Sequence, residues 1–161
     1  MIVLGIDPGE TLIGIGVIEK QGSELCLVNY ECIEVESKKE TAEKLEEINK
    51  KLSVIIKKYK PELVGIESLF FFKNQKTVIR VAQARGVLLL VCKQHNLKIL
   101  EFTPLQAKQA VACYGRADKK QVQEMVKAIL NLSEVPKPDD AADALALAIC
   151  AANTSENLIK N

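Results

Sequence analysis

The sequence predicts a single α/β domain over residues 1–161, in which a mixed five-stranded sheet is flanked by helices on both faces. Three observations lead to this class. Short apolar β-rich segments fill the first part of the chain, amphipathic helical patterns follow them, and two more short apolar segments separate these helices. The length suits one domain, and we find no repeat, linker or low-complexity segment that would divide it.

The first three strands are expected to form an antiparallel meander. Residues 2–7 are an apolar run that ends in Asp-Pro-Gly, which is a strong turn signal. Residues 11–19 are β-rich and residues 24–35 are also strand-like, and the connections between the three segments are short. Two shorter apolar strands are expected at residues 63–66 and 97–102.

Two long helices are expected between the third, fourth and fifth strands. Apolar residues recur every three or four positions over residues 41–60, which predicts an amphipathic helix that ends before Pro61. A second helix is expected over residues 74–95, where the run Val87–Cys92 is apolar almost all round. Gly86 costs about 1 kcal/mol relative to alanine inside a helix, so we expect another helix to approach closely there.

Three further helices follow the fifth strand. The segment Thr103-Pro104-Leu105-Gln106 has the N-cap, first-turn proline and capping-box glutamine of a helix start, and residues 118–121 also form a capping box. The last helix is expected over residues 138–152 and is rich in alanine. Because small side chains let a helix lie close against a sheet, we expect this helix to do so.

The net charge of +1 hides an uneven distribution. Residues 71–130 carry eleven Lys and Arg against three acidic residues, a local charge of +8, whereas the rest of the chain carries −7. This basic block is consistent with a polyanionic partner and also with solvated helix faces. The near-zero total excludes a disordered acidic chain and a polybasic tail.

Cysteine usage and hydropathy lead us to expect a cytoplasmic protein. The five cysteines are odd in number, widely spaced and without a C-x-x-C pair, which argues against a zinc site or a disulfide framework. They are expected to be reduced thiols, mostly in the core. We see no apolar run of the roughly 18 residues that a membrane span needs, and no secretory signal after Met1.

Four carboxylates are expected to converge at one edge of the sheet. Asp7 ends the first strand and Glu67 follows the fourth, and the helical crossover between them makes these strands parallel neighbours. Asp140 and Asp143 lie three residues apart on one face of the last helix. Two unit charges about 4 Å apart repel by roughly 4 kcal/mol at an effective dielectric constant of 20, so the cluster needs divalent cations. Oxygen ligands favour Mg²⁺ or Mn²⁺, and two such ions would form a nuclease site.

Most of these acids, taken alone, also have a structural explanation. Asp7 precedes Pro-Gly and could serve as a turn residue. Asp139 and Asp140 could simply favour the N-terminus of the last helix. Asp143 is harder to explain in this way, because it lies in an apolar helix face with no Lys or Arg three or four residues away.

In these motifs the sequence resembles the RuvC family of Holliday-junction resolvases. The resemblance covers nearly the whole chain, in order, and the set of motifs is specific although each motif alone is not. The segments that carry it are Gly5-Ile6-Asp7-Pro8-Gly9 with Gly14 and Gly16, Ile66-Glu67 with Phe70 and Lys73-Asn74, Gln83-Ala84-Arg85-Gly86-Val87, Asp140 to Ala146, Lys108-Gln109, and Lys119 with Gln121-Val122-Gln123.

The resemblance implies an RNase H-like fold and Mg²⁺-dependent paired nicking of four-way DNA junctions at symmetric positions. We expect two Mg²⁺ ions per site, with Mn²⁺ as a substitute, and the resemblance assigns them to Asp7, Glu67, Asp140 and Asp143. It also implies a homodimer and cooperation with a RuvA–RuvB branch-migration motor. Gly86 and the apolar run after it lead us to place the dimer interface on the helix at residues 74–95.

The expected DNA contacts combine the resemblance with the basic block. The resemblance places Phe70 near the junction bases and Lys108 and Lys119 on phosphates. Three consecutive phenylalanines cannot all face one way, so an exposed ring could stack on a base, and core packing is the alternative. The full set of expected DNA contacts is Phe70, Lys73, Arg80, Arg85, Lys108, Arg116 and Lys119.

Two departures from the family pattern leave questions open. Asp139 stands where a small residue is common, and it competes with Asp140 as a ligand because residues 139 and 143 also share a helix face. Glu10 replaces a usual small polar residue near the site.

The sequence leaves three rival functions. Another RNase H-like nuclease, acting on hybrids or processing RNA, is not excluded by the acid cluster alone, but the Phe70 and Arg85-Gly86 context argues against it. An actin-like or sugar-kinase ATP-binding domain would need a second phosphate loop and an adenosine-binding glycine pair, which the sequence lacks. A DNA-binding module without catalysis would leave the acids unexplained.

Overall fold

The computed structural model describes residues 1–68, 75–112 and 117–159, with the backbone alone described at 75–76 and 155–159. One five-stranded sheet with the strand order β3-β2-β1-β4-β5 forms its centre. Its strands are β1 (Ile2–Asp7), β2 (Leu12–Gln21), β3 (Glu24–Glu34), β4 (Leu63–Glu67) and β5 (Lys98–Phe102). The first three pair antiparallel, and β4 lies parallel between β1 and β5. The predicted mixed sheet, meander and parallel β1–β4 pair are all confirmed.

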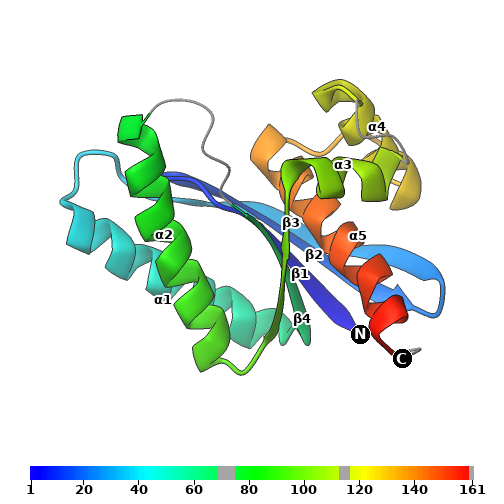
Figure 1. The fold of residues 1–161 in the computed structure, drawn as a ribbon, viewed down its shortest axis with the longest axis horizontal. Coiled ribbons are helices and arrows are strands. Elements are labelled where there is room, and N and C mark those ends of the chain that lie inside the picture. The colour runs from blue at the N-terminus through cyan, green and yellow to red at the C-terminus, as the bar shows by residue number, and fades with distance from the viewer. Residues whose placement is uncertain (69–74, 113–116, 160–161) are drawn as a thin grey trace.

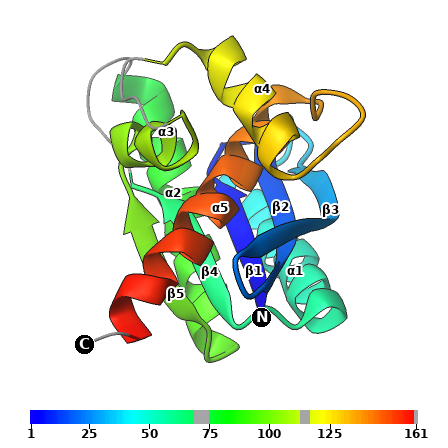
Figure 2. The same cartoon turned by 90° about the vertical axis from the view of Figure 1, so that its right-hand side faces the viewer.

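Helices cover both faces of the sheet, as Figures 1 and 2 show. The helices are α1 (Thr41–Tyr59), α2 (Gln75–Gln94), α3 (Pro104–Ala112), α4 (Lys119–Ile129) and α5 (Asp139–Ile159). One face is covered by α1 and α2, and the other by α5 with α3 and α4 beside it. Each face has its own apolar core, so the sheet is buried on both sides.

The helix starts follow the capping chemistry of the sequence. Thr103 Oγ1 accepts from the Gln106 amide at 3.1 Å, and the Gln106 side chain accepts from the Thr103 amide at 2.8 Å. Asp118 and Gln121 make the same reciprocal pair at the start of α4. The end of the last helix differs from the prediction: α5 continues to Ile159 instead of ending at residue 152, because no glycine or proline follows to stop it.

Glycines on one face of the sheet let α5 lie directly on the strands. A Cβ built on Gly5 would stand 1.8 Å from the Ala144 carbonyl oxygen, and one on Gly14 would stand 1.9 Å from the Asp140 carbonyl oxygen. The contact is therefore between main chains, and no side chain separates the helix from the strands. The predicted close packing of the alanine-rich helix is confirmed.

The expected close approach at Gly86 does not occur within the described part of this chain. Outside its own stretch of helix, no described atom lies within 4 Å of a Cβ built there, because Gly86 faces solvent on the outer side of α2. Exposed Ile79 and Leu90 share this face at helical spacing. Most of the apolar run after Gly86, by contrast, packs inward: Leu88, Val91 and Cys92 are buried against the sheet.

The four described cysteines, Cys26, Cys32, Cys92 and Cys150, are free thiols. Cys92 and Cys150 are buried in the core as expected, whereas Cys32 is partly exposed and Cys26 is exposed on strand β3. Within the described ranges, none of the helices combines the length and the apolar character that crossing a membrane requires.

Candidate active site

The sheet and α5 bring the four predicted acids to one edge of the molecule. Asp7 and Glu67 follow directly on the paired residues Ile6 and Ile66, so they end neighbouring parallel strands. Side chains alternate along a strand, and the glycines two positions earlier face α5, so both carboxylates face α5 as well. Asp140 and Asp143 lie in the first turns of α5, above the same edge.

The acids interact strongly enough to change one another's protonation. Burial is the largest of the causes that together raise the pKa of Asp7 to about 8, and the charges of Glu67, Asp143 and Asp140 contribute after it, in that order. Burial and the Asp143 charge raise the pKa of Glu67. Asp7 lies at the centre of this group, and its carboxyl is neutral at pH 7 until a cation compensates its charge.

One lysine partly neutralises the cluster. Lys119, the first residue of α4, places its Nζ 3.2 Å from Asp143 Oδ2 and 3.3 Å from Asp139 Oδ2. Burial raises the pKa of Asp143 while Lys119 lowers it, and the net shift is upward. In the described ranges, no three Asp, Glu, His or Cys side chains are grouped closely enough to hold a metal ion as they stand.

The neighbours of Asp139 and Asp140 distinguish the two residues. Gln123 donates to Asp139 Oδ1 at 2.9 Å, and this bond and Lys119 lower the pKa of the exposed Asp139. Asp140 instead raises the pKa of Asp7 and of Cys32, so it faces the sheet. The geometry therefore favours Asp140, not Asp139, as the companion of Asp143 next to Asp7.

A small pocket of about 150 Å³ opens beside the acids. Its polar wall is formed by Glu67, Asp143, Lys108 and Lys119. The Lys108 charge lowers the pKa of Glu67 against the upward effect of burial, so this ammonium group lies near the Glu67 carboxylate. Carboxylate oxygens and ammonium groups in one pocket suit a metal ion and an anionic substrate group together.

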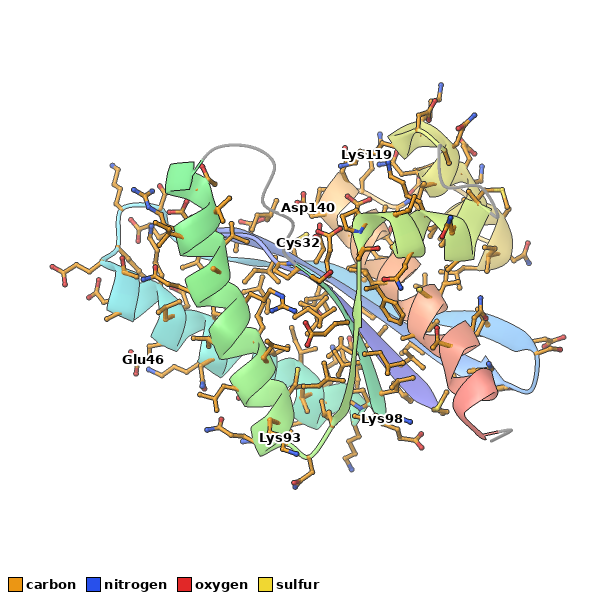
Figure 3. The ribbon with its side chains drawn as sticks, viewed as in Figure 1. Cys32, Glu46, Lys93, Lys98, Lys119 and Asp140 are labelled. Carbon is orange, nitrogen blue, oxygen red and sulfur yellow. The ribbon has the colours of Figure 1, made fainter. Side chains whose placement is uncertain are left out.

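Sequence reasoning did not single out Cys32, which lies beside the acids. Cys32 pairs with Gly14, and Gly14 pairs with Asp7, so the three residues form one row across the sheet. Burial and the charge of Asp140 raise the pKa of the Cys32 thiol to about 11, and Figure 3 shows the two side chains at the same end of the sheet. Only the register of the three paired strands could have shown that Cys32 lies beside the acids.

The expected DNA contacts fall into different surroundings. Arg80 is exposed on α2 and places Nη1 3.1 Å from Glu10 Oε1, which Lys44 also contacts at 3.4 Å. Arg85 is turned toward Glu101 and the Glu67 main chain. Phe70, Lys73 and Arg116 lie outside the described residues.

The described part of the basic block, residues 75–112 and 117–130, places its basic residues in separate parts of the molecule. Lys93 and Lys98 belong to the block, but they lie at the end of the molecule opposite Asp140 and Lys119 (Figure 3). Lys108 and Lys119, by contrast, line the pocket at the acids. The interpretation as solvated helix faces suits Lys93 and Lys98, and binding of a polyanion by Lys108 and Lys119 stays a prediction.

A family model described as crossover junction endodeoxyribonuclease RuvC matches residues 3–151. The chain belongs to the RuvC family. A RuvC relative from Halothermothrix orenii is 54% identical over 154 residues, which cover 96% of this chain and 93% of the relative. Another from Caldicellulosiruptor saccharolyticus is 52% identical over 160 residues, with 99% and 96% coverage.

Solved RuvC structures have the same fold. RuvC from Thermus thermophilus matches with a TM-score of 0.89 at 32% identity, covering 98% of this chain and 96% of that one. Its complex with a Holliday junction substrate matches with a TM-score of 0.88 at 30% identity and the same coverage. The yeast mitochondrial resolvase Ydc2 shares the fold at a TM-score of 0.72 and 15% identity. The predicted RNase H-like fold is confirmed.

The raised pKa of Asp7 predicts an unusual pH dependence for this RuvC-family chain without metal. The folded protein keeps the Asp7 proton up to about pH 8, whereas the unfolded chain loses it near the ordinary aspartate pKa of 3.8. Stability should therefore fall as pH rises from about 5 to 8, by at most about 1.4 kcal/mol per pH unit from this group. Thermal unfolding in EDTA across this range measures the slope. Asp7→Asn should flatten it, and an equal slope in the variant would contradict the assignment.

Proposed function

We propose that this chain is a Holliday-junction resolvase, an endodeoxyribonuclease that makes paired symmetric nicks in four-way DNA junctions during recombination and repair. The family model and the relatives at about 50% identity support the activity class. The single observation that supports catalysis by this chain is the convergence of Asp7, Glu67, Asp140 and Asp143 at one edge of the sheet.

RuvC-family nucleases are metal-dependent, and the residues of this site fit a hard divalent cation. The donors are carboxylate oxygens, and the pKa of Asp7 is raised by burial first and then by the neighbouring acids, whose negative charge a bound cation would compensate. We propose two Mg²⁺ ions, with Mn²⁺ as a substitute, held by Asp7, Glu67, Asp140 and Asp143. Such ions stabilise the attacking and leaving oxygens of phosphodiester hydrolysis. For Asp143 to serve as a ligand, its ion pair with Lys119 must open.

The ammonium groups of Lys108 and Lys119 are proposed to bind the phosphates of the junction, because both line the pocket beside the acids. Arg80, Lys73 and Arg116 are proposed as further phosphate contacts, and Phe70 as the ring that stacks on a crossover base. The branch-migration motor RuvA–RuvB remains the proposed partner, on the strength of the resemblance.

The deciding experiment offers the protein several DNA substrates with Mg²⁺ and with EDTA. A labelled four-way junction, a matched duplex and an RNA–DNA hybrid of the same sequence are compared under single-turnover conditions. Symmetric nicks in the junction alone, lost in EDTA, are the expected result. Cleavage of the hybrid in preference to the junction would instead indicate another RNase H-like nuclease.

A homodimer through the outer face of α2 is proposed because two equivalent strands must be cut. Ile79, Gly86 and Leu90 share this face, and Ile79 and Leu90 expose 63% and 53% of their surface. A two-fold dimer on such an apolar face would present two equivalent sites to the junction.

We predict that Gly86→Leu weakens the dimer and paired nicking together. Sedimentation at micromolar concentration measures the dimerisation of the parent protein and of the variant. A parent protein that is monomeric throughout would contradict the proposal.

A further inference from the structure

The end of strand β4 is fixed by two sets of hydrogen bonds, one to the neighbouring strand β5 and one to a side chain of helix α2. Glu67 is the last residue of β4, and Ser68 after it donates its amide and its hydroxyl to the Phe102 carbonyl, at 2.8 and 3.0 Å. The carbonyl of Glu67 itself accepts a hydrogen bond from Arg85 Nε at 2.8 Å. The main chain of a proposed metal ligand is thus fixed by a side chain from a different element.

Arg85 is itself anchored before it reaches Glu67. Its neighbours along α2, Ala84 and Leu88, are buried against the sheet, so this turn of the helix has little freedom. The other arm of the guanidinium donates from Nη2 to Glu101 Oε2, and Glu101 of β5 pairs with Ile66. The Arg85 side chain is 14% exposed, compared with 61% for Arg80 on the same helix.

The two ends of Glu67 therefore have separate partners. Its carboxylate faces α5 with Asp143 and Lys108, whereas its carbonyl is held by Arg85, which reaches it from α2 on the other face of the sheet. The planar guanidinium of an arginine can donate to two acceptors at fixed angles at once, whereas the ammonium group of a lysine, on a flexible chain, fixes such a geometry less well. Displacing a reacting group by about 1 Å costs on the order of a hundredfold in rate.

We propose that Arg85 is a positioning residue, which fixes the Glu67 main chain so that the carboxylate meets Asp7 and Asp143 in the geometry that the metal site needs. This role replaces the phosphate contact that the basic block led us to expect of Arg85. The inference rests on the proposed function. Arg85 acts through Glu67 and has no contact with the reacting phosphate.

The test compares Arg85→Ala with Arg80→Ala and with Lys93→Ala, a control on the same helix at the opposite end of the molecule. Arg85→Ala should lower the single-turnover cleavage rate at saturating junction by about 10- to 100-fold. It should weaken Mn²⁺ binding, measured by calorimetry without DNA, and leave the junction dissociation constant unchanged. Arg85→Lys should recover part of both losses. Arg80→Ala should lower junction affinity and flatten its dependence on log salt by about 0.9.

Specific results would overturn the inference. If Arg85→Ala loses junction affinity and salt dependence as Arg80→Ala does, with Mn²⁺ binding intact, Arg85 is a phosphate contact. If Arg85→Ala does not fold, Glu101→Gln, which releases the other arm of the guanidinium, should shift rate and Mn²⁺ affinity in the same direction. If the cleavage rate and the Mn²⁺ affinity of both Glu101→Gln and Arg85→Lys then equal those of the parent protein, the inference is refuted. A parent protein that does not cut junctions refutes the proposed function instead.

Discussion

Asp7→Asn is expected to reduce junction cleavage by about a thousandfold or more while junction binding persists. Asp7 is the carboxyl on which the charges of Glu67, Asp143 and Asp140 all act, so it occupies the centre of the proposed metal site. Losing a metal ligand there removes several kcal/mol of transition-state stabilisation, and each 1.4 kcal/mol is about tenfold in rate. Binding depends on phosphate contacts from Lys and Arg, and removing an acid leaves these intact.

The measurement is single-turnover cleavage of a synthetic junction in Mg²⁺, with binding followed in EDTA by gel shift. Glu67→Gln should behave in the same way as Asp7→Asn. Asp139→Asn is the matched control, because Asp139 is exposed and held by Gln123 and Lys119 at the rim of the cluster. It should retain cleavage and stability. Activity lost in Asp139→Asn but kept in Asp140→Asn would reverse the assignment of the two residues.

The second large effect is expected from Gly14→Ala, a change of one methyl group. The added Cβ would stand 1.9 Å from the Asp140 carbonyl oxygen and 2.5 Å from its carbonyl carbon. Both atoms belong to the main chain of α5, so the helix itself must move away from the sheet. Overpacking of this kind costs about 1–3 kcal/mol or more of stability. Moving Asp140 by about 1 Å should also cost on the order of a hundredfold in cleavage.

Denaturant unfolding and cleavage below the unfolding transition separate these two effects. Gly86→Ala provides the control for unfolding of the chain, since the same methyl group meets no described atom outside its own stretch of helix within 4 Å there. It should gain up to about 1 kcal/mol, because glycine is the poorer helix former. A Gly14→Ala protein with parental stability and rate would show that α5 does not rest on the strand as described.

The fold and the acids were predictable because they depend on local patterns. The turn after Asp7, the period of residues 41–60 and the two capping boxes each follow from a few neighbouring residues. Asp7 and Glu67 could be brought together because a helix between two strands makes the strands parallel.

The remaining features depend on register and on contacts between distant elements. Asp139 and Asp140 both share a helix face with Asp143, and their partners on other elements distinguish them: Gln123 and Lys119 of α4 hold Asp139, whereas Asp140 acts on Asp7 and Cys32 of the sheet. The row that joins Cys32 to Asp7 needs the pairing of three strands. Arg85 was grouped by its charge with the other basic residues, and its contact with Glu67 depends on how α2 packs against the ends of β4 and β5.

The direct contact between α5 and the strands also indicates where this nuclease can be engineered. The spacing between α5 and the strands is set by main-chain atoms, whereas the opposite core reaches the catalytic edge through Arg85 of α2. Apolar side chains of α1, such as Ile48 and Leu52, belong to that opposite core and can be repacked for greater heat resistance where Ala84 and Leu88, which anchor the turn that carries Arg85, are left in place. The glycines that face α5 offer no such freedom. A thermostable variant should therefore be sought on the α1 side, with β1, β2 and the first turns of α5 left unchanged.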